Sequence, residues 1–139
     1  MISKALKLCY EAHKEQKDKG GAPYYLHPIR VALCMETPSQ KVVALLHDIV
    51  EDTEISLDYL RDCGFTETII EAVEAITRRS GEPYNEYLCR VKKNELAREV
   101  KIEDLLDNLD LSRLPSITAK DKAREKKYKA ALRFLCEEA

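Results

Sequence analysis

The adjacent pair His47-Asp48 is the feature of the sequence that most clearly suggests chemistry. It directly follows an apolar run (residues 42–46), and two more acidic residues, Glu51 and Asp52, come soon after it. An imidazole and a carboxylate are both good ligands for a divalent cation. Adjacent residues on a helix diverge by about 100°, so both can reach one ion only near a helix end. The alternative is an ordinary helix C-terminus, but its carboxylates would oppose the helix dipole, and a bound cation would remove that conflict.

Two other segments carry residues of the same kinds. His27 lies before Pro28, at a turn where the backbone is restricted. Asp104 and Asn108 are four residues apart and therefore share one face of a helix. Taken alone, these could be a capping histidine and a solvated polar stripe. Taken with the central pair, they give two histidines and two aspartates on three helices, which suits one octahedral divalent ion with positions left for water. Such an ion lowers the pKa of bound water and neutralises phosphate oxygens.

The elements that would position these residues are helices. Apolar residues recur at helical spacing, short turns separate the segments, and no stretch alternates with the period of a strand. Ser39, Ser56 and Thr66 are expected N-caps, and Thr118 with Asp121 resembles a capping box. The expected helices cover residues 2–16, 28–35, 40–52, 57–60, 67–77, 84–91, 95–111 and 119–136. The sequence therefore predicts an all-α helical bundle, folded as one domain over residues 1–139.

Composition narrows the classes of function. A formal net charge of −2 gives no general attraction to nucleic acid polymers or membranes. Five cysteines, with no CxxC pair, argue against a disulfide framework or a cysteine zinc site. The N-terminal residues lack the apolar region of a signal peptide, and no apolar run is long enough for a membrane span. We expect a cytoplasmic protein with a small-molecule partner, and the sequence gives no prediction of its oligomeric state.

Three blocks in this order resemble the hydrolase domain of RelA/SpoT-type proteins, and especially their small single-domain relatives within the HD superfamily. They are PYYLHPIRVA (23–32), ALLHDIVEDT (44–53) and VKIEDLLDNL (100–109), and the resemblance extends over about residues 13–111. HDIVEDT is the most specific, because it combines the His-Asp pair with a Glu-Asp step at fixed spacing. The resemblance implies an HD-type helical bundle that removes pyrophosphate from the ribose 3′ position of ppGpp and pppGpp. Some relatives hydrolyse other nucleotides, including the 2′-phosphate of NADPH.

The resemblance also implies roles for individual residues. Glu51 and Asp52 match the acidic pair that positions and deprotonates the attacking water. Asn108 matches a polar residue that lines the nucleotide pocket. The residues that match the family's metal ligands, where the ion is usually manganese, are His27, His47, Asp48 and Asp104. The residues that we expect to bind substrate are Lys19, Tyr24, Lys101 and Asn108.

The sequence departs from the family pattern at three positions around this set. Asp18 stands where the family usually has an arginine that packs on the guanine base, and a carboxylate cannot stack as a guanidinium does. Leu105 replaces an arginine, and Asp107 replaces a histidine. These changes spare the expected metal ligands and alter the surroundings that would recognise the base.

Three hypotheses of different classes follow. The first is a Mn²⁺-dependent phosphohydrolase that acts on ppGpp or a related nucleotide through metal-activated water. The second, motivated by Asp18 and Leu105, is a nucleotide-binding or regulatory HD domain that no longer catalyses turnover. The third is a structural helical domain without a site, which leaves the acidic end of the apolar central helix unexplained.

Overall fold

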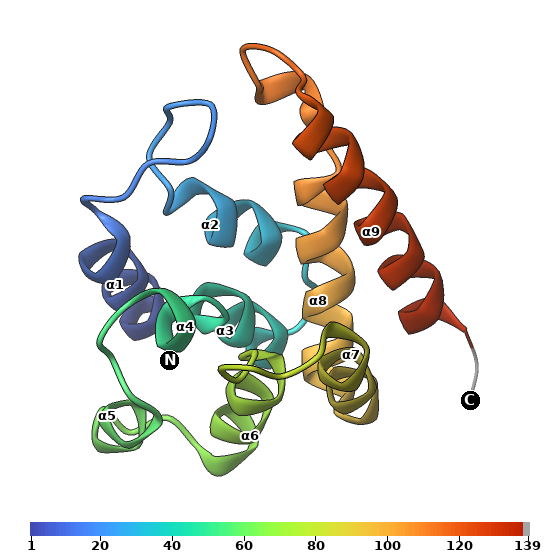
Figure 1. Cartoon of the computed structure of the whole chain (residues 1–139). Coiled ribbons are helices and arrows are strands. Elements are labelled where there is room, and N and C mark those ends of the chain that lie inside the picture. Colours follow the sequence, from blue (N-terminus) through green and yellow to red (C-terminus); the bar gives the residue numbers. More distant parts are fainter. Residues whose placement is uncertain (138–139) are drawn as a thin grey trace.

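Helices account for most of the chain in the computed structural model, which describes residues 1–137. Within that range, the only extended pairing is an isolated bridge between Lys17 and Pro23. The elements in chain order are α1 (Ile2–His13), α2 (Leu26–Leu33), α3 (Pro38–Leu46), α4 (Ile49–Asp52), α5 (Leu57–Asp62), α6 (Glu67–Ile76), α7 (Tyr84–Lys93), α8 (Glu95–Asn108), the short 3-10 helix η1 (Leu111–Arg113) and α9 (Ala119–Cys136) (Figure 1). The expectation of an all-α fold is confirmed.

The apolar helix α3 lies at the centre of the arrangement. Its residues 42–46 are each at most 3% exposed, as expected for a helix that is apolar on nearly every side. It packs against α1, α2, α6 and α8, while α9 runs along the outer side of α8 (Figure 1). The helices that carry the expected site residues are therefore anchored on one core.

The helix predicted over residues 40–52 is broken at the His47-Asp48 pair. His47 caps the C-terminus of α3, and Asp48 is the N-cap residue of the four-residue helix α4. Glu51 and Asp52 thus belong to a separate short helix. The break places the imidazole and the adjacent carboxylate at a helix end, where both can face the same point.

Two predicted helix starts were wrong. The N-cap of α3 is Thr37, not Ser39: its side chain accepts a hydrogen bond from the backbone of Gln40, and the Gln40 side chain accepts one from the Thr37 backbone. This capping box is stronger than a single serine cap, and Pro38 suits the first helical position. Helix α2 begins at Leu26, so that His27 lies within its first turn.

Other boundaries agree more closely. Ser56 and Thr66 are the N-cap residues of α5 and α6, although the Thr66 side chain makes no cap hydrogen bond. Thr118 and Asp121 form the predicted capping box at the start of α9. Helix α7 extends two residues beyond its predicted end, whereas α1 and α8 end three residues before theirs.

Within the described residues, no helix is both long enough and apolar enough to span a membrane.

Candidate metal centre and adjoining cavity

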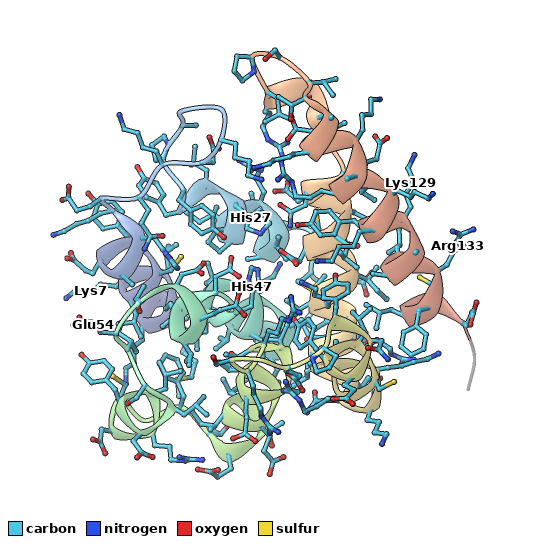
Figure 2. All side chains as sticks on the ribbon, in the orientation of Figure 1. Lys7, His27, His47, Glu54, Lys129 and Arg133 are labelled. Carbon is cyan, nitrogen blue, oxygen red and sulfur yellow. The ribbon has the colours of Figure 1, made fainter. Side chains whose placement is uncertain are left out.

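Four side chains from three separate parts of the chain converge beside the C-terminal end of α3. One ligand atom each of His27, His47, Asp48 and Asp104 lies within 4.8 Å of all the others. Asp104 Oδ1 lies 2.7 Å from His27 Nε2 and 3.2 Å from His47 Nε2. Asp48 Oδ2 lies 3.2 Å from His47 Nε2 and 3.8 Å from His27 Nε2. Figure 2 shows the two histidines in the middle of the molecule, where α2, α3 and α8 meet.

The outer nitrogen of each imidazole is held by a hydrogen bond. His47 Nδ1 donates to the carbonyl oxygen of Ala44 (2.5 Å), and His27 Nδ1 donates to Asp107 Oδ2 (2.6 Å). Because Nδ1 is engaged in this way in both rings, Nε2 is the nitrogen that faces the cluster and would bind a metal ion once its proton is displaced. Hydrogen bonds of this kind fix the ring orientation and raise the basicity of metal-binding histidines.

The two carboxylates are held in a comparable way. Lys101 Nζ donates to Asp104 Oδ2 (2.8 Å), which leaves Oδ1 facing both imidazoles. The Tyr24 hydroxyl donates to Asp48 Oδ2 (2.6 Å). Two nitrogen and two oxygen donors, with two negative charges among them, form a set that suits a borderline or hard divalent cation. The residues present therefore fit a divalent metal ion.

The charges of the cluster are strongly coupled. Burial alone would lower the pKa of His27, but the carboxylates of Asp104 and Asp107 outweigh it and raise that pKa to about 10. Burial alone would raise the pKa of Asp104, but Lys101 and the two imidazoles hold it well below its usual range. A divalent cation would supply the same positive charge and displace the imidazole protons.

Glu51 and Asp52, the expected water-activating pair, lie just beyond Asp48 in α4 but differ in their surroundings. Glu51 Oε1 accepts a hydrogen bond from the backbone N–H of Arg78 (2.9 Å), which ties it to the loop after α6. Partial burial, followed by the negative charges of Asp48 and Glu51, raises the pKa of Asp52 to about 6. A carboxylate with a pKa close to neutral is better suited to accept a proton from water.

A cavity of about 300 Å³ adjoins His27. It lies between the loop that precedes α2, the end of α8 and the first half of α9. Of the expected substrate-binding residues, Lys19, Tyr24 and Asn108 line this cavity. Lys101 does not, since it lies on α8 with its ammonium 5.5 Å from the centre of the Tyr87 ring.

The three departures from the family pattern have structural explanations. Asp18 Oδ1 accepts hydrogen bonds from the backbone N–H groups of Gly20 and Ala22 (both 2.9 Å) and so closes the turn before α2. Leu105 is fully buried in the core. Asp107 accepts hydrogen bonds from Arg30 (2.9 and 3.0 Å) as well as from His27. Asp18 and Asp107 thus hold parts of the site in place.

The motif blocks did not reveal one buried residue, His13. It is fully buried, its Nδ1 lies 2.8 Å from the side-chain oxygen of Gln16, and its ring lies 5.2 Å from the ring of Tyr24. It therefore supports the tyrosine that holds Asp48. Its position was readable from the sequence, because Ala5, Cys9 and His13 follow one another at helical spacing on the buried face of α1.

Comparison with known proteins identifies relatives of this chain. It is 30% identical over 120 residues to a guanosine-3′,5′-bis(diphosphate) 3′-pyrophosphohydrolase of Aquifex aeolicus, covering 78% of this chain and 17% of the relative. It is 36% identical over 109 residues to the putative GTP diphosphokinase RSH1 of Arabidopsis thaliana, covering 75% of this chain and 12% of the relative. The chain thus spans less than a fifth of these relatives. No protein-family model matches it.

One solved structure has a similar fold over nearly the whole chain. It is described as a metazoan orthologue of SpoT that hydrolyses ppGpp, and it superposes with a TM-score of 0.77 at 23% sequence identity. The superposition covers 96% of this chain and 84% of that protein. At this level of identity, the match establishes that the two share a fold.

Proposed function

We propose that this chain, a relative of the RelA/SpoT-type HD hydrolases, is a metal-dependent phosphohydrolase that acts on ppGpp or a related nucleotide. The similarity that the motif blocks predicted is confirmed by the named relatives and by the fold. One observation carries the proposal: His27, His47, Asp48 and Asp104 converge from three parts of the chain beside the cavity that His27 lines.

These four residues are our proposed ligands for the ion, and Mn²⁺ is our proposed metal. Bound there, a divalent ion supplies Lewis-acid neutralisation of phosphate charge and lowers the pKa of water. Lys101 keeps Asp104 ionised, while Tyr24 fixes the orientation of Asp48. The protein thereby holds its donor atoms in one arrangement before any substrate arrives.

Asp52 is our proposed general base, and Glu51 its positioning partner. Hydrolysis forms a bond between a water oxygen and the phosphorus atom attached to the ribose 3′ oxygen. The bond between that phosphorus and the ribose oxygen breaks. The water proton passes to Asp52, and the ribose oxygen leaves and takes a proton from solvent. The products are pyrophosphate and a nucleoside 5′-diphosphate. Glu51 accepts a hydrogen bond from the Arg78 backbone and so holds α4 against the loop after α6.

The cavity beside His27 is our proposed site for the nucleoside. Tyr24 and Asn108 line it and donate hydrogen bonds to Asp48 and Asp104, and Lys19 also lines it. Partial burial, together with the nearby Arg124 and Lys120, lowers the pKa of Lys19, so an anionic ligand would relieve repulsion there. Asp18 offers no surface for stacking on a base, so we expect recognition to depend on phosphate more than on guanine.

We further propose that the chain acts in the cytoplasm, as one domain over residues 1–139, on a free nucleotide. The nearly balanced charge of −2 supports a small-molecule substrate, because it gives no general attraction to a polyanion.

The test is release of pyrophosphate from ppGpp by the chelator-treated full chain after Mn²⁺ is added back. A parallel panel of nucleotides, including NADPH with phosphate release as the readout, separates chemistry from specificity. Cleavage of another nucleotide but not of ppGpp would overturn the substrate and leave the chemistry standing. No cleavage of any nucleotide, with metal bound, would favour the non-catalytic binding domain instead.

A matched pair of variants tests the proposed base. Asp52→Asn should lower kcat by about 100-fold or more, as loss of a general base usually does. Asp62→Asn makes the same chemical change at an exposed position at the end of α5 and should leave kcat unchanged. Equal kcat values for Asp52→Asn and the wild type would remove Asp52 from the mechanism.

A further inference from the structure

A second polar cluster lies next to the metal centre and shares no residue with the lining of the cavity. It contains Arg78 from the loop after α6, Tyr84 at the start of α7, Lys101 in α8 and Lys127 in α9. Lys127 Nζ lies 4.0 Å from the centre of the Tyr84 ring, and the Arg78 guanidinium carbon lies 5.3 Å from it. Lys101 joins the group through Tyr87, whose ring centre lies 5.9 Å from that of Tyr84. Three cations from three elements thus lie around two neighbouring tyrosines.

Most of this positive charge has no acidic partner. Lys101 pairs with Asp104, but the Arg78 side chain donates only to the uncharged carbonyl oxygen of Glu82 (2.9 and 3.1 Å). Among residues 1–137, no carboxylate lies within 4.0 Å of Lys127. Partial burial and then the charges of Arg78 and Lys101 lower the pKa of Lys127. The cluster therefore has an excess of positive charge that an anion would offset.

The Tyr84 hydroxyl is a second and independent observation. Its oxygen is buried, and it has no hydrogen-bond partner among the described residues. A buried hydroxyl without a partner costs about 1 to 3 kcal/mol, so such groups are rare and call for an explanation. An anion oxygen placed among the three cations would accept this hydrogen bond.

Two contacts connect the cluster to a proposed metal ligand and to the water-activating pair. Lys101 donates to Asp104, and the Arg78 backbone donates to Glu51. None of the four cluster residues lines the cavity beside His27. The metal centre thus has a cavity on one flank and this cationic cluster on another.

We propose that Arg78, Tyr84, Lys101 and Lys127 form a binding site for the diphosphate group that the reaction splits from the nucleotide. The inference rests on the proposed function. With the nucleoside in the cavity, the phosphorus under attack lies at the metal centre and the outer phosphate extends into the cluster. When the bond to the ribose oxygen breaks, the water oxygen stays on the pyrophosphate, whose charge the three cations offset. Several cations suit a group that carries more than one negative charge.

The experiment is calorimetric titration of inorganic pyrophosphate into the metal-free full chain, with inorganic phosphate as the comparison. Lys127→Gln should weaken pyrophosphate binding by about tenfold or more, because a hydrogen bond to a charged group is lost. Lys129→Gln is the matched control: it lies two residues away on α9, its side chain is 62% exposed, and it makes the same charge change. It should leave the affinity unchanged. Pyrophosphate should bind more tightly than phosphate.

Tyr84→Phe separates a binding role from a packing role. Removing a buried hydroxyl that has no partner should leave the Tm unchanged or raise it, while the affinity for pyrophosphate falls. If Tyr84→Phe and Lys127→Gln both bind pyrophosphate as the wild type does, the site is overturned and the cluster is cation–π packing alone.

A result that overturns the pyrophosphate site is distinct from a result that overturns the proposed function. Binding that depends on Lys127 supports the anion site whether or not a nucleotide is cleaved. If the wild type hydrolyses a nucleotide, pyrophosphate should also inhibit it as a product, and more weakly in Lys127→Gln than in Lys129→Gln. Equal inhibition of these two variants would overturn the role of the site in the reaction.

Discussion

Asp107 offers a way to weaken the candidate metal centre without changing any of its four proposed ligands. Its Oδ2 accepts the Nδ1 proton of His27 (2.6 Å), and Arg30 holds the same carboxylate through two hydrogen bonds (2.9 and 3.0 Å). Burial would raise the pKa of Asp107, but His27 and Arg30 keep it far below its usual range. His27 is thus oriented by a partner that stays negatively charged.

We predict that Asp107→Asn weakens Mn²⁺ binding by about 10- to 100-fold, the usual effect of removing a partner of a metal-binding histidine. This corresponds to about 1.4 to 2.8 kcal/mol of binding free energy. The amide keeps the size of the side chain but loses its charge, so His27 becomes less basic and less firmly oriented. The assay is titration of the chelator-treated protein with Mn²⁺, with free Mn²⁺ measured by electron paramagnetic resonance at constant pH.

Asp110→Asn is the control for this prediction. It removes the same charge three residues away, at a side chain that is 47% exposed and pairs with Arg113. A loss of affinity in Asp107→Asn alone means that orientation of His27 matters. Equal loss in both variants would mean that only the total negative charge matters. Unchanged affinity in Asp107→Asn would refute the reasoning from the hydrogen bond.

Three further predictions concern the pH profile, the capping box and the core. Since Asp52 has a pKa raised to about 6 and must be ionised to accept a proton, kcat/KM should fall as the pH drops through about 6, and Asp52→Asn should lack this limb; an unchanged profile in the variant would assign the limb to another group. Thr118→Ala should lower the free energy of unfolding by about 1 kcal/mol in urea titration, because it removes the N-cap of α9; the exposed Ser116→Ala is the control, and equal midpoints would contradict the prediction. Leu46→Ala should cost about 2 to 5 kcal/mol in the same assay, since Leu46 is fully buried, whereas Leu33, 76% exposed, should tolerate the change.

Helices were predictable from the sequence wherever an apolar stripe and a turn signal agreed. The central helix shows both the strength and the limit of this reasoning. Its burial followed from residues 42–46 alone, but its start was misplaced because Thr37 and Gln40 cap each other across Pro38. The break at His47-Asp48 was also missed, because nothing in the local sequence distinguishes one continuous helix from two consecutive helices, α3 and α4.

The proposed metal ligands could be named from the sequence because each lies in a short motif with fixed spacing. The hydrogen bonds that hold these ligands in place could not be predicted, because they join residues that are far apart in the sequence. Arg30 and Asp107 are 77 residues apart, and His27 and Asp107 are 80 residues apart. The same limit applies to Tyr84 and Lys127, which meet only because α7 packs against α9. A charged residue on an amphipathic helix looks like any other until the fold shows what faces it.

The pairing of charges around the site indicates what kind of nucleotide would suit it. The cavity's three arginines all have acidic partners: Arg30 pairs with Asp107, Arg113 pairs with Asp110, and Arg124 contacts Asp121.

Among residues 1–137, the cavity's lysines, Lys17 and Lys19, have no such partner within 4.0 Å, and neither do Arg78 and Lys127 in the cluster. The unneutralised positive charge thus lies in two places, one in the outer cavity and one beyond the metal centre. A nucleotide with phosphate groups at two separate positions would offset both charges at once. A nucleotide phosphorylated at one position would leave one of them uncompensated and should therefore bind more weakly, which supports the choice of a substrate phosphorylated at two positions, such as ppGpp.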